Sequence, residues 1–365
     1  MNFELSDEQM LLRDSVAGYL ARNYGFDARR EAAADRGWRP EAWRAFAEEL
    51  GLFGAALPED AGGFGGGPTE TMIIAEEFGR SLVLEPYIES VVLGAALIGS
   101  DDGELISRII DGSAIVAPAL YEGVARFSLG RIACKAKASG DGHVLEGTKI
   151  VVGGGPLATH FVVSASAGDD DLGIFVVQAD APGIERRDYA TIDGRPASDV
   201  TFSGAPASRL GASGNALPRI EAAVDCATAA LCAEAIGVMD VLLKSTVEYA
   251  RQREQFGVPI ATFQVLQHRM VDMLTQIERS RSLSIMASLS LDLPADERGR
   301  AVSAAKAYIG QALQFVGEAA IQIHGGIGTT EELAVSHYFK RATVMQSQFG
   351  TSAFHLERMA LLDEG

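Results

Sequence analysis

Two short stretches near the C-terminal end of this sequence contain residue types that could bind a nucleotide and do acid–base chemistry. The first, QIHGGIGTTEE at residues 322–332, resembles a turn built to accept a nucleotide. Glycines suit such a turn because a backbone without a Cβ atom can come close to a ligand. The second, QFGTS at residues 348–352, resembles a catalytic loop in which Phe349 takes the place of an acid. The sequence therefore combines a nucleotide cradle with a loop that lacks a base.

The titratable groups outside these stretches offer few candidates for catalysis. Glu234 lies in the apolar run ALCAEAIG, where burial would raise its carboxyl pKa, and it is the fallback candidate for a base. The alternative is a structural glutamate that is bonded to a neighbouring helix or an interface. His324 is expected to pack at the turn, although it could touch a cofactor, and His268 is expected at an interface. No two His or Cys residues have metal-ligand spacing on one helix face, so no metal is predicted.

Charge and cysteine content restrict the partners and the compartment. The chain has 365 residues and a net charge of −18, a balance that disfavours nucleic acid and anionic membrane surfaces. Its three cysteines form no CxxC pair, which indicates a reducing compartment without disulfides. The N-terminus lacks a basic start with an apolar segment, and no run of about 18 apolar residues occurs. We therefore expect a cytoplasmic protein that does not span a membrane.

The residue pattern changes twice along the chain, which predicts three domains. Residues 1–112 have helical patterns, whereas residues 113–214 contain short β-prone runs separated by Gly, Asp and Pro, as in antiparallel strands and hairpins. Residues 215–365 return to longer helical patterns. The predicted fold class is a mostly helical α+β multidomain protein, with an N-terminal helical domain, a middle antiparallel β-barrel and a C-terminal four-helix bundle. A doubly wound fold is excluded because no parallel strand precedes a glycine cluster.

Capping signals and apolar spacing predict where several helices begin. Ser6 followed by Gln9 predicts a capping box at the start of the first helix. In the C-terminal domain, apolar residues at helical spacing predict long amphipathic segments that begin near Leu217, Phe263 and Val302. A fourth segment is expected to start after Thr329, with Thr329 as the cap that pairs with Glu332. Four such segments joined by short turns would pack as an antiparallel bundle.

Four motifs together resemble the acyl-CoA dehydrogenase family, and the likeness covers nearly the whole chain. They are LPEDAGGFG at residues 57–65, DGHVLEGTK at 141–149, RQREQFGVPIATFQVLQHRMVDM at 251–273 and QIHGGIG at 322–328. The combination of R-x-x-F-G with Q-x-x-G-G-x-G at this spacing is quite specific. Within the family, the chain is most similar to the small, non-catalytic subunit of pimeloyl-CoA dehydrogenase and to related subunits of two-component enzymes.

The resemblance implies a protein that binds FAD at an interface, where the bundle of one subunit completes the ADP half of its neighbour's flavin site. The matching positions in this chain are Arg253, Phe256, Gln264, Gln322 and Gly326, with Thr351 in the loop that approaches the cofactor. Arg253 suits a pyrophosphate oxygen because a guanidinium forms charge-assisted hydrogen bonds. Gln264 and Gln322 suit ribose or adenine because an amide both donates and accepts.

Departures from the family pattern concern the base and the flavin ring. The family's catalytic glutamate precedes Gly-Thr in the loop where this chain has Phe349. A minority of the family places the glutamate on the first bundle helix, and the matching residue here is Ala227. PALYEGVARFS and IVVGG replace the two β-domain motifs that contact the ring, and Ala353 replaces a glutamine of the loop. The clamp offered to a neighbour is therefore kept, while the chain's own ring pocket and base are lost.

The family's reaction is the α,β-dehydrogenation of an acyl-CoA thioester, in which a base takes a proton from Cα and flavin accepts a hydride from Cβ. A positioned base is worth about 10²- to 10⁴-fold in rate. We therefore predict the base-lacking subunit of an oxidoreductase hetero-oligomer, a dimer or tetramer that uses FAD and an acyl-CoA and passes electrons to electron-transfer flavoprotein. Its relatives suggest fatty acid, steroid or dicarboxylate catabolism. The alternatives are a homo-oligomeric FAD acyl-CoA dehydrogenase with a displaced base and a non-enzymatic scaffold subunit.

Overall fold

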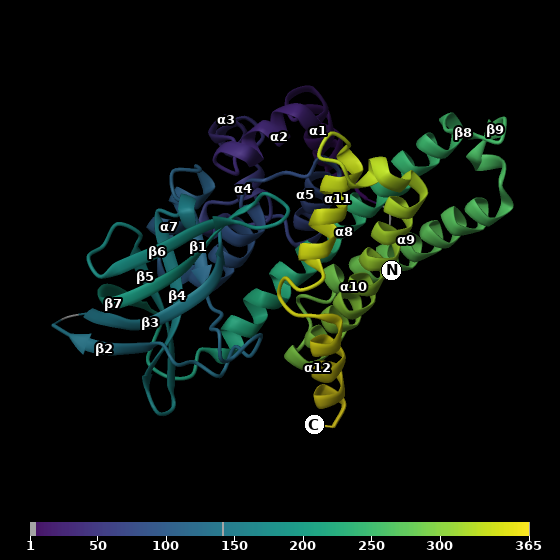
Figure 1. Ribbon diagram of the computed structural model, residues 1–365. Helices are drawn as coiled ribbons and strands as arrows, with labels where there is room; N and C mark the ends of the chain where they lie inside the picture. Colours follow the sequence, from purple (N-terminus) through teal and green to yellow (C-terminus); the bar gives the residue numbers. More distant parts are fainter. Residues whose placement is uncertain (1–4, 141, 365) are drawn as a thin grey trace. The chain divides into compact units, whose positions relative to one another are not determined.

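The computed structural model describes residues 5–140 and 142–364. Helices come first along the chain, strands follow, and helices return from Leu217 onward (Figure 1). The predicted order of helical, β and helical segments is therefore confirmed. By spatial contacts the chain divides into two compact units. The barrel unit contains residues 30–71 and 84–227, and the helical unit contains residues 72–83, the described residues up to Arg29 and those from Thr228 onward.

Local capping sets the start of two of the helices that precede the strands. These helices are α1 (Asp7–Asn23), α2 (Phe26–Asp35), α3 (Pro40–Arg44), α4 (Leu52–Ala55), α5 (Pro68–Ser81), α6 (Ala95–Ile98) and α7 (Gly103–Ile110). The Ser6 hydroxyl accepts from the Gln9 N–H at 3.2 Å, and the Gln9 side chain accepts from the Ser6 N–H at 3.0 Å. The predicted capping box is therefore confirmed. Asp102 caps α7 in the same sense, by accepting from the Leu105 N–H at 2.9 Å.

The strands of the barrel unit close into a small barrel. Within the described residues they are β1 (Val116–Ala119), β2 (Lys135–Ser139), β3 (Gly142–Gly153), β4 (His160–Gly168), β5 (Asp171–Gln178), β6 (Ile184–Ala190) and β7 (Pro196–Leu210). The neighbours run β4–β2–β3–β7–β5, and β5 pairs again with β4, which closes the ring. Two strands lie outside this ring: β1 pairs with β4, and β6 pairs with β7. Large buried side chains such as Leu145, Phe161 and Phe202 form the core of this barrel.

Most neighbouring strands are antiparallel as predicted, but two pairs are parallel. Strand β1 pairs with β4 from Val116–His160 to Ala119–Val163, and β2 meets β4 at Lys135 and Ser166. The prediction of an antiparallel barrel is therefore wrong in this detail. Parallel neighbours need a long connection, and the whole β2–β3 hairpin lies in the connection between β1 and β4.

The helical unit is arranged around α10. Its helices after the strands are α8 (Leu217–Gln252, shared with the barrel unit), α9 (Gln264–Leu289), α10 (Ala295–His324), α11 (Ala334–Met345) and α12 (Ser352–Glu364). Helix α10 packs against α9, α11 and α12. The two-stranded hairpin of β8 (Glu254–Gln255) and β9 (Val258–Pro259) joins α8 to α9 (Figure 1). The ends of α8 and α9 therefore lie next to this hairpin.

Helix α8 is the most apolar long helix within the described residues. Within the described residues it contains an 18-residue window that is apolar enough, by length and composition, to cross a membrane. Charged residues such as Asp225, Glu234 and Asp240 interrupt the helix, so it contains no unbroken apolar run of that length. In addition, 78% of that window is buried inside the structure. Its apolar residues thus serve as core of the protein.

The start of α11 differs from the predicted cap. Helix α11 begins at Ala334 after Leu333, which makes no side-chain capping bond. Thr329 instead belongs to a 3₁₀ turn, and its hydroxyl donates to the Gly326 carbonyl at 2.9 Å. The prediction that Thr329 caps this helix is wrong because the helix begins five residues after Thr329, which lies at the end of the 3₁₀ turn.

Helix α5 approaches α8 closely at two glycines within the helical unit. A Cβ atom added to Gly79 would lie 2.0 Å from the Glu234 carbonyl oxygen, and one added to Gly237 would lie 2.0 Å from the Glu76 carbonyl oxygen. Both obstacles are backbone atoms, so no change of side-chain rotamer could relieve the clash. The two helices can therefore cross at this distance only with glycine at both positions.

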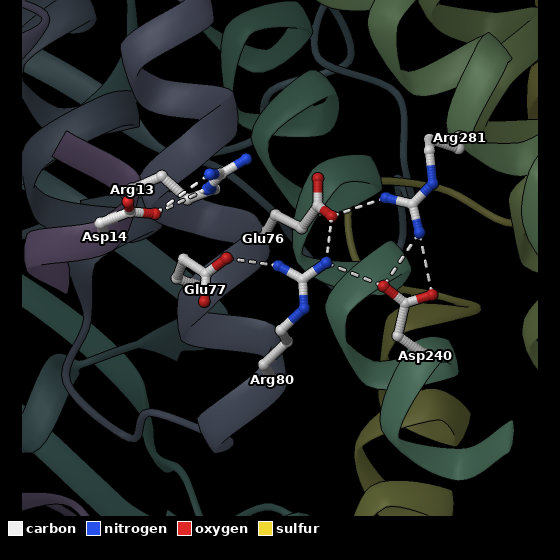
Figure 2. Close-up of polar contacts among 7 residues, drawn as sticks. All are labelled: Arg13, Asp14, Glu76, Glu77, Arg80, Asp240 and Arg281. Carbon is white, nitrogen blue, oxygen red and sulfur yellow. Dashed lines mark hydrogen bonds and ion pairs between the residues drawn. The ribbon is translucent and has the colours of Figure 1, made fainter. Parts of the chain in front are cut away.

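A ring of opposite charges closes around the same crossing (Figure 2). On α5, Glu76 and Arg80 pair with each other. Arg80 also reaches Asp240 of α8 at 2.8 Å, and Arg281 of α9 bonds both Asp240, at 2.9 Å, and Glu76. Glu77 pairs with Arg80 beside the ring. Each charge thus has an opposite charge on both sides, which ties α5 to α8 and α9.

Gly237→Ala is expected to destabilise the chain strongly, because its methyl group would clash with the backbone of α5. Overpacking typically costs about 1–3 kcal/mol, and we expect at least about 3 kcal/mol here because a carbonyl oxygen cannot move aside like a side chain. Urea unfolding measures this change. Gly18→Ala in α1 is the matched control, since its Cβ would meet only the tip of Arg22 at 3.4 Å. Equal stability of the two variants would contradict the close crossing.

Candidate functional site

The hairpin after α8 carries the first two residues of the predicted clamp. The backbone of Arg253 is fixed, since its N–H donates to the Tyr249 carbonyl at 2.8 Å and its carbonyl accepts from the Ile260 N–H at 2.8 Å. Phe256 lies between β8 and β9 with a φ of 56°, and 93% of it is exposed. A positive φ is rare for a bulky residue, and such strain is concentrated at functional sites. The hairpin is therefore a candidate contact site.

The two glutamines of the predicted clamp lie at helix ends. Gln264 is the first residue of α9, and Gln322 lies in the last turn of α10. Both are exposed, as is Arg253. In the part of the chain that the structure describes, none of these three side chains forms a hydrogen bond or an ion pair. Their donor groups are therefore available to a ligand.

An aromatic pair joins the end of α8 to the end of α10. The Tyr249 ring stacks on the His324 ring, with their centroids 4.4 Å apart and 25° between their planes. The Tyr249 hydroxyl also donates to the His324 carbonyl at 3.3 Å. Tyr249 lies one helical turn before Arg253. This pair therefore brings the hairpin and the glycine turn together at one end of the helical unit.

The glycine turn after α10 exposes bare backbone. Residues Gly325–Thr329 form a 3₁₀ turn, and Gly325 has a φ of 65° in the left-handed region. A Cβ atom added to Gly325 or to Gly326 would meet no other atom within 4 Å. Both glycines are exposed. The turn therefore leaves room for a ligand next to its backbone, as predicted for a nucleotide.

The loop in which a base was expected holds a buried phenyl ring. Phe349 is 7% exposed and has a φ of 60°. Its carbonyl accepts a hydrogen bond from His355 Nε2 at 3.2 Å, so Nδ1 of the same ring accepts from the Ser303 hydroxyl at 3.2 Å. Burial, with the charges of Lys306 and Arg358, lowers the pKa of His355 to about 3. This imidazole is therefore neutral at ordinary pH and supports the loop as a fixed hydrogen-bond bridge.

Lys306 and Thr351 hold the rest of this loop. The buried Lys306 Nζ donates to the carbonyl oxygens of Gly350 at 2.7 Å and Gln346 at 3.3 Å. Burial lowers the pKa of Lys306 to about 8. The Thr351 hydroxyl oxygen accepts from the Phe354 N–H at 3.3 Å, at the start of α12. Thr351, a predicted cofactor contact, thus has a capping contact within the chain, and its hydroxyl proton remains available.

The two alternative positions for a base are both buried in α8. Glu234 forms a two-pronged ion pair with Arg341 of α11, in which Nε and Nη2 reach the two carboxylate oxygens at 2.9 and 2.7 Å. Each of these side chains is 2% exposed. This is the arrangement expected of a structural glutamate bonded to a neighbouring helix. Ala227 places a buried methyl group at the other position.

In the barrel unit, the segments that correspond to the family's flavin-ring motifs use their polar groups internally. The buried carboxylate of Glu122 accepts from Lys149 Nζ at 2.8 Å and from the N–H groups of Ala133 and Cys134. Three backbone N–H groups of the segment 150–154 also have partners. The N–H of Ile150 donates to the Tyr121 carbonyl at 2.9 Å, and the N–H of Val151 donates to Asp199 at 3.1 Å. The N–H of Gly154 donates to the Pro196 carbonyl at 2.9 Å. These N–H groups are therefore not free to bind a flavin ring.

Thiols and metal ligands add no second chemistry to the described residues. None of Cys134, Cys226 and Cys232 forms a disulfide within the described residues. Burial raises the pKa of Cys134 to about 11 and that of Cys232 to about 12, so both thiols stay protonated. Among residues 5–140 and 142–364, no group of three or more His, Cys, Asp or Glu side chains could hold a metal ion.

The sequence analysis missed three residues that shape these segments: Tyr249, Lys306 and His355. Tyr249 could have been found from its spacing, because it lies four residues before Arg253 on the same helix face. Lys306 could have been found as a charge inside the apolar stripe of α10. The role of His355 depends on contact with Ser303, more than fifty residues away in sequence, and no local pattern indicates it.

Family models match the chain in three consecutive segments. The model described as the acyl-CoA dehydrogenase N-terminal domain matches residues 6–98. The middle-domain model matches residues 119–205, and the C-terminal-domain model matches residues 217–361. The predicted clamp and the Phe349 loop lie in the third segment, and the segments around Glu122 and Lys149 lie in the second.

Individual relatives match over almost their whole length. The chain is 27% identical over 356 residues to the acyl-CoA dehydrogenase IpdE2 of Mycolicibacterium smegmatis, which covers 97% of this chain and 98% of the relative. Among solved structures, a variant of the Tcur3481–Tcur3483 steroid ACAD gives a TM-score of 0.90 at 30% identity, covering 98% of each chain. The ChsE4–ChsE5 complex from Mycobacterium tuberculosis gives a TM-score of 0.90 at 28% identity, covering 100% of each chain. Each of these two structures joins two differently named chains.

Proposed function

Because this chain belongs to the acyl-CoA dehydrogenase family, whose members are FAD-dependent oxidoreductases acting on CH–CH bonds, we propose that it is the base-lacking subunit of a hetero-oligomeric enzyme. Its clamp residues Arg253, Phe256, Gln264, Gln322 and Gly326, with Thr351 nearby, complete the ADP half of the partner's FAD site. The partner supplies the flavin-ring pocket and the catalytic glutamate. The substrate is an acyl-CoA.

One contrast carries this proposal. The polar side chains of the clamp, Arg253, Gln264 and Gln322, are exposed and have no partner in the described chain. The position of the base is instead a buried Phe349, whose loop is held by His355 and Lys306. Buried polar groups usually form hydrogen bonds inside the fold, whereas a side chain that binds a ligand must keep its hydrogen-bonding groups unoccupied. The chain is thus equipped to hold a nucleotide and has no carboxylate at the position that takes the substrate proton.

The residues of the clamp fit an ADP group by their chemistry. A guanidinium suits the pyrophosphate because it forms charge-assisted hydrogen bonds to phosphate oxygens. Exposed amides suit ribose and adenine, and the bare backbone of Gly326 lets the ligand come close. When bound, the flavin supplies the acceptor for the hydride that leaves the substrate. On the barrel side, the N–H groups of Ile150, Val151 and Gly154 are already used, which supports a ring pocket in the partner rather than in this chain.

The exposed side of α9 supports an interface at the clamp. Val271 and Leu289 are 58% and 45% exposed. They lie seven and twenty-five residues after Gln264 on the same helix side, since 3.6 residues make one turn. Apolar residues that remain exposed along one side of a helix favour coverage by another chain. The partner's bundle is the surface that we propose to cover them.

Several further features belong to the same proposal. We expect domain boundaries at 1–112, 113–214 and 215–365, with an antiparallel four-helix bundle in the third domain. We also expect a cytoplasmic dimer or tetramer that delivers electrons to electron-transfer flavoprotein. The name of one relative, the Tcur3481–Tcur3483 steroid ACAD, favours a steroid-type acyl-CoA among the substrates considered, which also include fatty and dicarboxylic acyl groups.

Turnover of acyl-CoA by the chain alone and with a partner tests this function. The product of a neighbouring acyl-CoA dehydrogenase gene should be co-expressed with this chain. Oxidation of acyl-CoA is then followed with an artificial electron acceptor. We expect activity from the pair and none above background from this chain alone. A yellow homo-oligomer that turns over acyl-CoA would instead support the displaced-base enzyme. Absence of flavin with and without the partner would support the scaffold.

A further inference from the structure

His324 in the glycine turn has one ring nitrogen that the fold uses and one that it leaves without a partner. The side chain is 5% exposed. Its Nδ1 lies 2.8 Å from the Ala320 carbonyl oxygen. A carbonyl oxygen can only accept, so Nδ1 carries the proton and donates. Burial lowers the pKa of His324, which keeps the ring neutral and leaves Nε2 as an acceptor.

No donor within the described residues reaches this Nε2 atom. The other contacts of His324 are the stacking of the Tyr249 ring and the bond from the Tyr249 hydroxyl to the His324 carbonyl. Within the described residues, Nε2 is not one of the fully buried side-chain atoms that lack a partner. This acceptor therefore reaches the surface, where a donor that belongs to a ligand can bind it.

The neighbours of His324 identify the kind of ligand. Gln322, Gly325 and Gly326 are exposed on both sides of it in sequence, and the stacked Tyr249 lies one turn before Arg253. A guanidinium, an amide and bare backbone N–H groups all donate, which suits a phosphate-bearing ligand. His324 adds an acceptor to this set. A nucleoside diphosphate such as ADP matches both, since its phosphates accept hydrogen bonds from the donors and its adenosine part carries groups that can donate to the acceptor.

We propose that His324 Nε2 accepts a hydrogen bond from the adenosine part of the bound nucleotide, from either the amino group of adenine or a ribose hydroxyl. This inference rests on the proposed clamp. It makes His324 a binding residue that distinguishes nucleotides by a donor, whereas Arg253 binds their charge. Tyr249 is the positioning residue, because its ring covers one face of the imidazole.

The test uses the hetero-oligomer after removal of its flavin, with this chain labelled with ¹⁵N-histidine, and titrates it with nucleoside diphosphates. ADP is compared with purine riboside diphosphate, which lacks the amino group, and with 2′-deoxy-ADP and 3′-deoxy-ADP. We expect the His324 Nε2 resonance to shift with ADP, and one analogue to bind about three- to tenfold more weakly, the size of one neutral hydrogen bond. The analogue that loses affinity identifies the donor group. His324→Phe keeps the stacking on Tyr249, and it should bind ADP and that analogue equally.

The outcomes separate this inference from the clamp itself. Arg253→Met should weaken all four nucleotides alike. Suppose that Arg253→Met weakens all four nucleotides, while ADP and its analogues bind equally to the natural chain. The proposed clamp is then supported, and the role of His324 is overturned. Discrimination that persists in His324→Phe overturns it as well. If millimolar ADP does not bind, or binds without regard to Arg253, the proposed clamp fails and this inference fails with it. The analogue series on the natural chain gives an answer even if the His324 variant does not fold.

Discussion

Arg253→Met is expected to strip flavin from the hetero-oligomer. Arg253 is exposed and has no ion-pair partner in the described chain, so its guanidinium is free to bind the pyrophosphate. A hydrogen bond to a charged group contributes about 1.5–3 kcal/mol, which corresponds to roughly 10- to 150-fold weaker flavin binding. Flavin retained after gel filtration, together with the affinity for added FAD, measures the loss. Folding should be unaffected, because only the backbone of Arg253 bonds to the rest of the chain.

Two variants serve as controls for Arg253. Arg251→Met removes an exposed charge from the last turn of α8, two residues before Arg253, and it should leave flavin retention unchanged. Arg253→Lys keeps the charge but loses the planar fork that matches a phosphate, so it should lie between the natural chain and the methionine variant. If Arg251→Met and Arg253→Met lose flavin equally, a general charge effect explains the result and the clamp is wrong.

Glu234→Gln is expected to leave turnover per bound flavin unchanged in the hetero-oligomer. In the structure Glu234 binds Arg341 through both carboxylate oxygens, and we propose that this pair is its role. If Glu234 were the displaced base, its loss would lower turnover by about 10²- to 10⁴-fold. Rates must be divided by bound flavin, because the amide also weakens the ion pair and reduces the folded fraction.

The structural role of the same pair predicts a large loss of stability in Arg341→Met. Removal of one partner leaves a buried charge without compensation and costs about 3–5 kcal/mol. The double variant Arg341→Met/Glu234→Leu removes both charges, and much of this loss should be recovered. Urea unfolding of the two variants and the natural chain gives the comparison. Equal stability of the single and double variants would show that the pair carries no buried-charge penalty.

Local patterns predicted the elements of this fold better than their pairing. The capping box of Ser6 and Gln9 involves residues three apart, and the structure contains it. The parallel contacts of β4 with β1 and β2 join segments far apart in sequence, and strand patterning contains no signal for a parallel partner. The cap of α11 was mispredicted because Thr329 had two possible uses, and the glycines before it favoured the 3₁₀ turn.

The candidate site shows the same division between local and distant information. Motif spacing identified Arg253, Gln264 and Gln322, and all three side chains are exposed in the structure. It also identified the substitution at Phe349. It could not indicate that Arg341 would bind Glu234 from another helix, because a lone arginine in a helical pattern is usually a solvated charge. Buried polar contacts of this kind depend on which helices meet, which the local sequence does not specify.

The flavin content of the purified hetero-oligomer tests the central claim most directly. The pair should be co-expressed, purified through a tag on this chain, and its flavin measured by absorbance after denaturation against the amount of each subunit. One flavin for each pair of subunits is the predicted result, because we propose that the ring pocket and the base belong to the partner. One flavin for each subunit would contradict the account, since this chain would then hold a flavin of its own.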